Sequence, residues 1–96
     1  MYSYELQKLS IEMTSCEKEV FKWIYKNRSV QFKDLQNQVN SNPKNLAYNL
    51  NSQKLDLIVQ KLMGYGLIKI KPAILNEFKM ILITATSFQF IQYFKK

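Results

Sequence analysis

Residues 55–71 read LDLIVQKLMGYGLIKIK, and the hydrophobic period changes in the middle of this stretch. In the first half, apolar side chains recur every three or four residues, which predicts a helix that buries one face. Gly64 and Gly66, the only two glycines of the chain, then predict a turn, because glycine adopts positive φ at little cost. After the turn, isoleucine and lysine alternate, which is typical of a half-buried strand. The stretch therefore predicts a helix, a glycine turn and a strand.

The residues that follow this stretch complete a hairpin and add a last helix. Residues 78–83 are apolar and partly β-branched, which predicts a second strand. With the loop between the strands, residues 67–83 form a two-stranded β-hairpin. The rest of the chain, residues 84–96, has the spacing of a terminal helix. The apolar face of that helix is Phe88, Ile91 and Phe94.

The segment before residue 55 is helical in pattern. Asn42 followed by Pro43 is a helix start signal, but the apolar stripe shifts further along. Leu46 and Leu55 lie about 180° apart at ~100° per residue, so one straight helix cannot bury both. We therefore expect a break near Asn51. The predicted helices span residues 1–13, 16–27, 32–40, 43–50 and 52–63, with residues 29–31 as an extended connector.

Composition indicates a single domain. The chain has 96 residues, 47% of them hydrophobic, and no Pro/Gly/Ser-rich linker divides it. We interpret residues 1–96 as one mostly helical α+β domain, with an N-terminal helix at 1–13, a helical core at 16–64, the hairpin at 67–83 and a terminal helix at 84–96.

Charge favours a polyanionic partner, and the residue types argue against catalysis. Fourteen Lys and Arg oppose seven Asp and Glu, a net charge of +7, and nucleic acid is the leading candidate partner. Without histidine and with one cysteine, Cys16, the chain cannot build a Cys/His zinc site or a Ser-His-Asp triad. We expect a cytoplasmic protein that is not an enzyme, binds no cofactor or metal, and has neither a signal peptide nor a membrane span.

The spacing of several apolar residues resembles a known family. The pattern Phe32-x-x-Leu35-x-x-x-Val39, followed by Leu55-x-x-x-Val59-x-x-Leu62-x-x-x-Gly66-Leu67-Ile68, resembles the helix-turn-helix and exit turn of winged-helix regulators of the MarR and HxlR type. Asn42-Pro43-Lys44-Asn45-Leu46 is similar to the Ser-Pro-Lys start of an HxlR recognition helix. The resemblance covers about residues 16–94. It implies a winged helix-turn-helix in which one helix enters the DNA major groove and the hairpin wing reaches the adjacent backbone or minor groove.

Two helices compete for the recognition role. Counting back from Gly66 favours residues 52–63, whereas the resemblance at Asn42 favours residues 43–50, and Asp56 is unfavourable near phosphates. Both options stay open. The candidate DNA-binding residues are Lys44, Asn45, Tyr48, Ser52, Gln53, Lys54 and Lys61 on the helices and Lys69, Lys71 and Lys79 on the wing.

The terminal helices carry more apolar surface than one small core needs, which predicts a homodimer, although both helices could instead fold onto their own core. The candidate dimerisation residues are Leu6, Leu9, Phe88, Ile91 and Phe94. The predicted function is a homodimeric double-stranded DNA-binding transcriptional regulator, or a plasmid or phage partition adaptor. The alternatives are a single-stranded DNA-binding winged-helix protein of a mobile element and a winged-helix module that binds protein.

Overall fold

The computed structural model describes the backbone of residues 3–41 and 50–94, and the side chains of residues 5–41 and 50–92. Over these ranges the chain is α+β and mostly helical, with an antiparallel sheet. The α-helices are α1 (Ser3–Glu12), α2 (Ser15–Asn27), α3 (Phe32–Ser41), α4 (Ser52–Gly64) and α5 (Ala85–Phe94). The strands are β1 (Ser29–Gln31), β2 (Ile68–Lys71) and β3 (Met80–Ile83), and the short 3₁₀-helix η2 (Asn76–Phe78) precedes β3.

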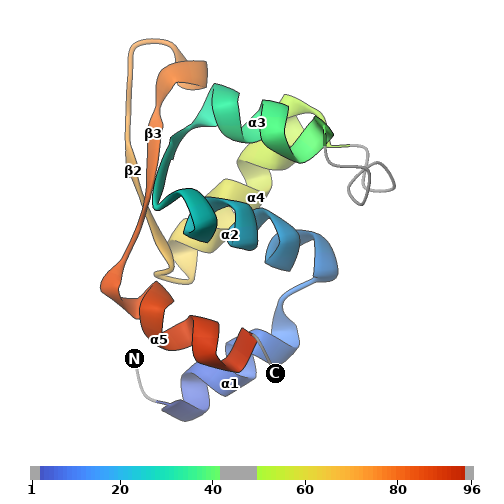
Figure 1. Cartoon of the computed structure of the whole chain (residues 1–96), viewed down its shortest axis with the longest axis vertical. Helices are drawn as coiled ribbons and strands as arrows, with labels where there is room; N and C mark the ends of the chain where they lie inside the picture. Colours follow the sequence, from blue (N-terminus) through green and yellow to red (C-terminus); the bar gives the residue numbers. More distant parts are fainter. Residues whose placement is uncertain (1–2, 42–49, 95–96) are drawn as a thin grey trace.

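The elements form two ends (Figure 1). At one end α1 and α5 pack against each other, and at the other the β2–β3 hairpin projects beside α3. Helix α2 runs through the middle and contacts both α3 and α4. The predicted helix at residues 43–50 lies outside the described residues, except for the buried Leu50.

Helix α2 begins and ends at residues with clear local reasons. At its start, the hydroxyl of Thr14 accepts a hydrogen bond of 3.1 Å from the backbone N–H of Glu17, which satisfies one unpaired donor of the first turn. At its end, Arg28 has a positive φ of 66° with a ψ of −45°, and its backbone N–H donates to the carbonyls of Ile24 and Tyr25. The guanidinium of Arg28 stacks 4.3 Å from the ring centroid of Tyr25 and 5.2 Å from that of Phe88.

The segment expected as a connector is a strand. Residues Ser29–Gln31 pair with β3, so the sheet has three strands in the order β1-β3-β2, and the two-stranded hairpin carries a third strand. Val30 lies opposite Ile81, and both are buried. Three residues with one apolar side chain are too short to show a period of two, so no local pattern predicts a strand there.

The turn after α4 follows the glycine prediction. Asn51 caps the helix by accepting a 2.8 Å hydrogen bond from the backbone N–H of Lys54. Gly66 has a φ of 83°, and the N–H of Leu67 donates to the carbonyl of Leu62. The N–H of Gly66 donates to the carbonyl of Met63, and these two hydrogen bonds form a Schellman motif, which reverses the chain into β2. Gly64 is simply the last helical residue.

The core lies between the helices and the inner face of the sheet. Strand residues of one parity, among them Ile68 and Ile81, meet the buried faces of α2, α3 and α4. The side chains that are fully or almost fully buried include Phe21, Ile24, Leu35, Leu55, Val59, Leu62, Leu67 and Phe90. Burial of Leu55, Val59 and Leu62 confirms the predicted inward stripe of α4 and leaves its opposite face in solvent.

Candidate nucleic-acid interface

The outward face of α4 is arranged in three rows. Leu57 is 66% exposed and lies opposite the buried stripe of the helix. At ~100° per residue, Gln53 and Gln60 lie on one side of Leu57, and Lys54 and Lys61 lie on the other. All four of these flanking residues are exposed. The outward face of α4 therefore carries a row of side-chain amides, a central leucine and a row of ammonium groups, side by side.

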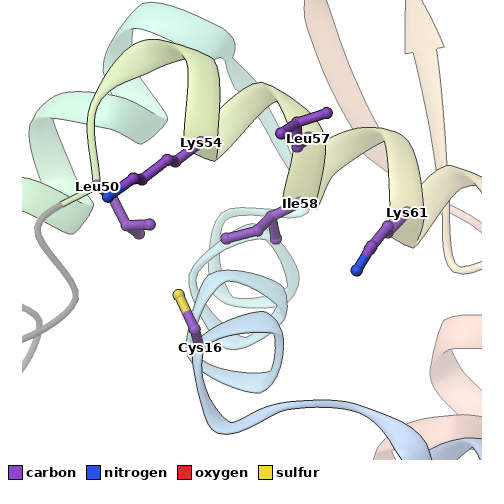
Figure 2. Close-up of a pocket in the computed structure, with 6 residues that line it drawn as sticks. All are labelled: Cys16, Leu50, Lys54, Leu57, Ile58 and Lys61. Carbon is purple, nitrogen blue, oxygen red and sulfur yellow. The ribbon is translucent and has the colours of Figure 1, made fainter.

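The side of α4 that carries Lys54 and Lys61 borders a groove (Figure 2). The groove has a volume of about 400 Å³ and lies between α4 and the start of α2. Its floor is apolar, with Cys16 of α2 facing Ile58 of α4 (Figure 2). Lys54 and Lys61 stand at its edge, so a cationic margin runs along this side of the helix.

The outer face of the hairpin also carries lysines. Lys69 pairs with Leu82 and Lys71 pairs with Met80 across the strands. Cross-strand partners share a face, so these lysines point away from the face that holds Ile68 and Ile81. Both lysines are exposed, and neither makes an ion pair with another residue that the structure describes.

Lys79 departs from the sequence-based prediction that it joins Lys69 and Lys71. It is only 4% exposed, and its ammonium forms an ion pair with Asp56 of α4. Lys79 precedes Met80, whose side chain is on the outer face, so the strand alternation turns Lys79 toward the core. Its Nζ also lies 4.8 Å from the ring centroid of Phe32. Its burial and its pairing with Asp56 therefore count against placing Lys79 on a DNA-binding surface, and alternation along residues 79–83 indicates the same.

The Asp56–Lys79 pair changes how α4 presents its charge. Asp56 is the only acidic residue of α4, and its carboxylate is paired with the buried ammonium. The pair also links the first half of α4 to the residue that precedes β3. Since Asp56 lies on the same side of the helix as Gln53 and Gln60, these glutamines occupy the flank nearer the hairpin.

A second acidic residue holds the other end of α4. Glu17 of α2 is 4% exposed and accepts a 3.0 Å hydrogen bond from the hydroxyl of Tyr65. Lys61 lies 3.9 Å from the same carboxylate. Partial burial raises the pKa of the Tyr65 phenol, and the Glu17 carboxylate raises it further. The sequence does not indicate this contact, because Tyr65 is 48 residues away from Glu17.

Several candidate residues thus keep the exposure that DNA binding requires. Ser52, Gln53, Lys54, Lys61, Lys69 and Lys71 are exposed on α4 and β2. Lys44, Asn45 and Tyr48 lie outside the described residues. Of the two candidate recognition helices, α4 is the one that lies within the described residues.

The candidate dimerisation residues need correction. Leu6, Leu9 and Ile91 are 2%, 7% and 9% exposed within a single chain, because α1 and α5 pack on each other. They serve the chain's own core, the alternative left open by the sequence. Phe88 is 49% exposed, and the side chain of Phe94 lies outside the described residues. The apolar excess of the terminal helices is thus largely used within one chain.

Other chemistry is limited in the described part of the chain. Partial burial raises the pKa of the Cys16 thiol, and the neighbouring Glu17 and Glu19 raise it further, so this thiol is a weak nucleophile. Among the described residues, no cluster of three or more His, Cys, Asp or Glu side chains could hold a metal ion. None of the helices in residues 3–41 and 50–94 is long and apolar enough to cross a membrane.

Comparisons with family models, with curated proteins and with solved structures gave no match to this chain.

Proposed function

We propose that the protein binds double-stranded DNA as a winged helix, with α4 in the major groove and the β2–β3 hairpin along the adjacent backbone. The element order supports this proposal, since α2, β1, α3 and α4 precede a hairpin whose strands complete an antiparallel sheet. A helix diameter suits the major groove of B-DNA, and a hairpin next to that helix can reach neighbouring phosphates.

One observation carries the proposal, namely the charge of the surfaces that α4 and β2 expose. Lys54, Lys61, Lys69 and Lys71 all reach solvent there, and the single acid, Asp56, is paired with a buried lysine. A polyanion therefore meets four ammonium groups without an uncompensated carboxylate on these two elements. Lysines at such positions release counterions from DNA when they bind phosphates.

A titration of labelled DNA tests the proposal. The protein is titrated against a duplex and against each of its single strands, at a low and a moderate salt concentration. We expect tighter binding to the duplex and an affinity that falls steeply with salt. Preference for a single strand would instead favour the single-stranded alternative. No binding to any DNA at low salt overturns the proposal.

The proposed biological role is that of a transcriptional regulator or a partition adaptor acting as a homodimer. A two-fold dimer would present two copies of α4 to a pseudo-palindromic site. Of the predicted dimerisation residues whose side chains the structure describes, Phe88 stays half-exposed, so an interface would form around it on α5. Light scattering tests this point, and a mass of one chain at the concentrations that bind DNA would contradict the dimer.

A further inference from the structure

The outward face of α4 matches the chemistry of one kind of base pair. Gln53 and Gln60 are exposed, and neither side-chain amide hydrogen-bonds to another described residue. An amide carries a donor and an acceptor, and the major-groove edge of adenine offers the complementary N7 and N6 groups. The two glutamines are seven residues apart, so they lie on the same side of the helix about two turns apart. They can therefore meet different base pairs along one groove.

Leu57 gives this face a second point of recognition. It is 66% exposed at the middle of a surface that is otherwise polar. In the major groove, the C5-methyl group of thymine is the apolar group that a base edge presents. An A·T pair shows this methyl beside the adenine edge, so an apolar side chain next to glutamines suits A·T pairs.

Residues that read guanine are scarce. The chain has one arginine, Arg28, and its guanidinium is stacked on Tyr25 and Phe88, away from α4. Lys54 and Lys61 lie on the opposite flank from the glutamines, along the groove edge (Figure 2). This position suits the phosphates of one strand. Bidentate arginine–guanine contacts, the commonest specific contacts to DNA, are thus absent from α4.

We infer that α4 reads A·T base pairs in the major groove, with Gln53 and Gln60 on adenine edges and Leu57 against thymine methyl groups. The inference rests on the proposed duplex binding and adds the class of sequence that the duplex must contain.

Three duplexes of equal length separate the possible causes of preference. The first contains A·T pairs, the second replaces its thymines by uracil and so lacks only the methyl groups, and the third contains inosine·cytosine pairs. Inosine·cytosine presents the major-groove edge of G·C and the minor-groove edge of A·T. A protein that reads the major groove therefore separates the first and third duplexes, whereas one that reads the minor groove binds them alike.

For the unchanged protein we expect about tenfold tighter binding to A·T than to inosine·cytosine, corresponding to one good amide–adenine contact. Uracil should weaken binding about threefold, since a buried methyl group is lost. Leu57→Ala should abolish the thymine–uracil difference, and Gln53→Ala with Gln60→Ala should abolish most of the preference for A·T. Ile11→Ala, which truncates another exposed apolar residue on α1, is the matched control and should change neither.

The outcomes separate the inference from the proposed function. Equal affinity for A·T and inosine·cytosine duplexes, or no effect of uracil, would overturn the base readout while leaving duplex binding intact. A uracil effect that survives in Leu57→Ala would also overturn the assignment of Leu57. Failure to bind any duplex at low salt would overturn both proposals together.

Discussion

Lys71 and Lys79 lie near the same end of the hairpin, one at the end of β2 and the other just before β3. Lys71 is exposed and pairs in register with Met80. Lys79, one position earlier than Met80, is 4% exposed and holds Asp56. A shift of one residue along a strand moves a side chain to the opposite face of the sheet. A lysine side chain is therefore exposed to solvent at position 71, whereas at position 79 it pairs with Asp56 and holds α4 in position.

This difference shows that a count of lysines along a hairpin overstates its cationic surface. The hairpin region has three lysines in sequence, but two of them face outward. The third contributes indirectly, because it pairs with the one acid of α4 and joins that helix to the hairpin. Four predictions separate side chains that hold α4 in place from side chains that are exposed to a ligand.

The largest effect is expected when the buried lysine loses its partner. Asp56→Ala leaves the ammonium of Lys79 buried and unpaired, and should lower the free energy of unfolding by about 3 kcal/mol. Lys79→Met should cost less, since Asp56 keeps 35% of its side chain exposed and can be hydrated. Urea unfolding followed by circular dichroism measures both. The double variant should recover much of the loss, and a double variant less stable than Asp56→Ala would contradict the pairing.

The next effect concerns the exposed lysines. Replacing Lys69 and Lys71 together by Ala should weaken duplex binding about tenfold at low salt and reduce the salt slope by about two, because two phosphate contacts are lost. Unfolding free energy should stay almost unchanged. Lys8→Ala, an exposed lysine on α1 at the other end of the molecule, is the control (Figure 1). Unchanged DNA affinity in the double variant would remove the hairpin from the interface.

A smaller effect is expected at the second contact that holds α4. Tyr65→Phe removes the hydroxyl that donates to the buried Glu17 and should cost about 1 kcal/mol of unfolding free energy. The phenol's raised pKa means that the folded state holds this proton more tightly than the unfolded state. Its stabilising effect is therefore complete below the ordinary tyrosine pKa and is lost as pH rises through the folded value. If Tyr65→Phe left both the unfolding free energy and its dependence on alkaline pH unchanged, the hydrogen bond to Glu17 would not stabilise the fold.

The smallest effect on stability is expected at Lys61. This lysine lies 3.9 Å from the Glu17 carboxylate, but 64% of its side chain is exposed. Water screens such a pair, so Lys61→Ala should change the unfolding free energy by less than about 0.5 kcal/mol. DNA affinity should fall in the same variant. A large loss of stability would mean that the Lys61–Glu17 pair stabilises the fold, as is expected of the Lys79–Asp56 pair.

The sequence was sufficient for elements whose signals are local. The inward stripe of α4, the turn at Gly66 and the strand Ile68–Lys71 all follow from periodicity and from the conformational freedom of glycine. The expected start of α2 near residue 16 is confirmed, and the helix begins there because the side chain of Thr14 caps it. For the candidate site, the exposed residues of α4 and β2 were predicted for the same reason.

The remaining features depend on partners far along the chain. β1 is a strand because β3 pairs with it, and three residues carry no period of their own. Lys79 is buried because α4 supplies Asp56, 23 residues earlier, to compensate its charge. Leu6 and Leu9 looked available for a partner molecule because nothing local shows that α5 covers them.

The packing of α1 on α5 also bears on how the protein is made. The ribosome makes α1 well before α5, the helix that covers its apolar face (Figure 1). Contacts between segments so distant in sequence form late, and an apolar surface that waits for its cover invites aggregation. Leu6 and Leu9 thus remain uncovered by α5 in the nascent chain. Chaperone demand should therefore concentrate on α1, far from the surface proposed to bind DNA.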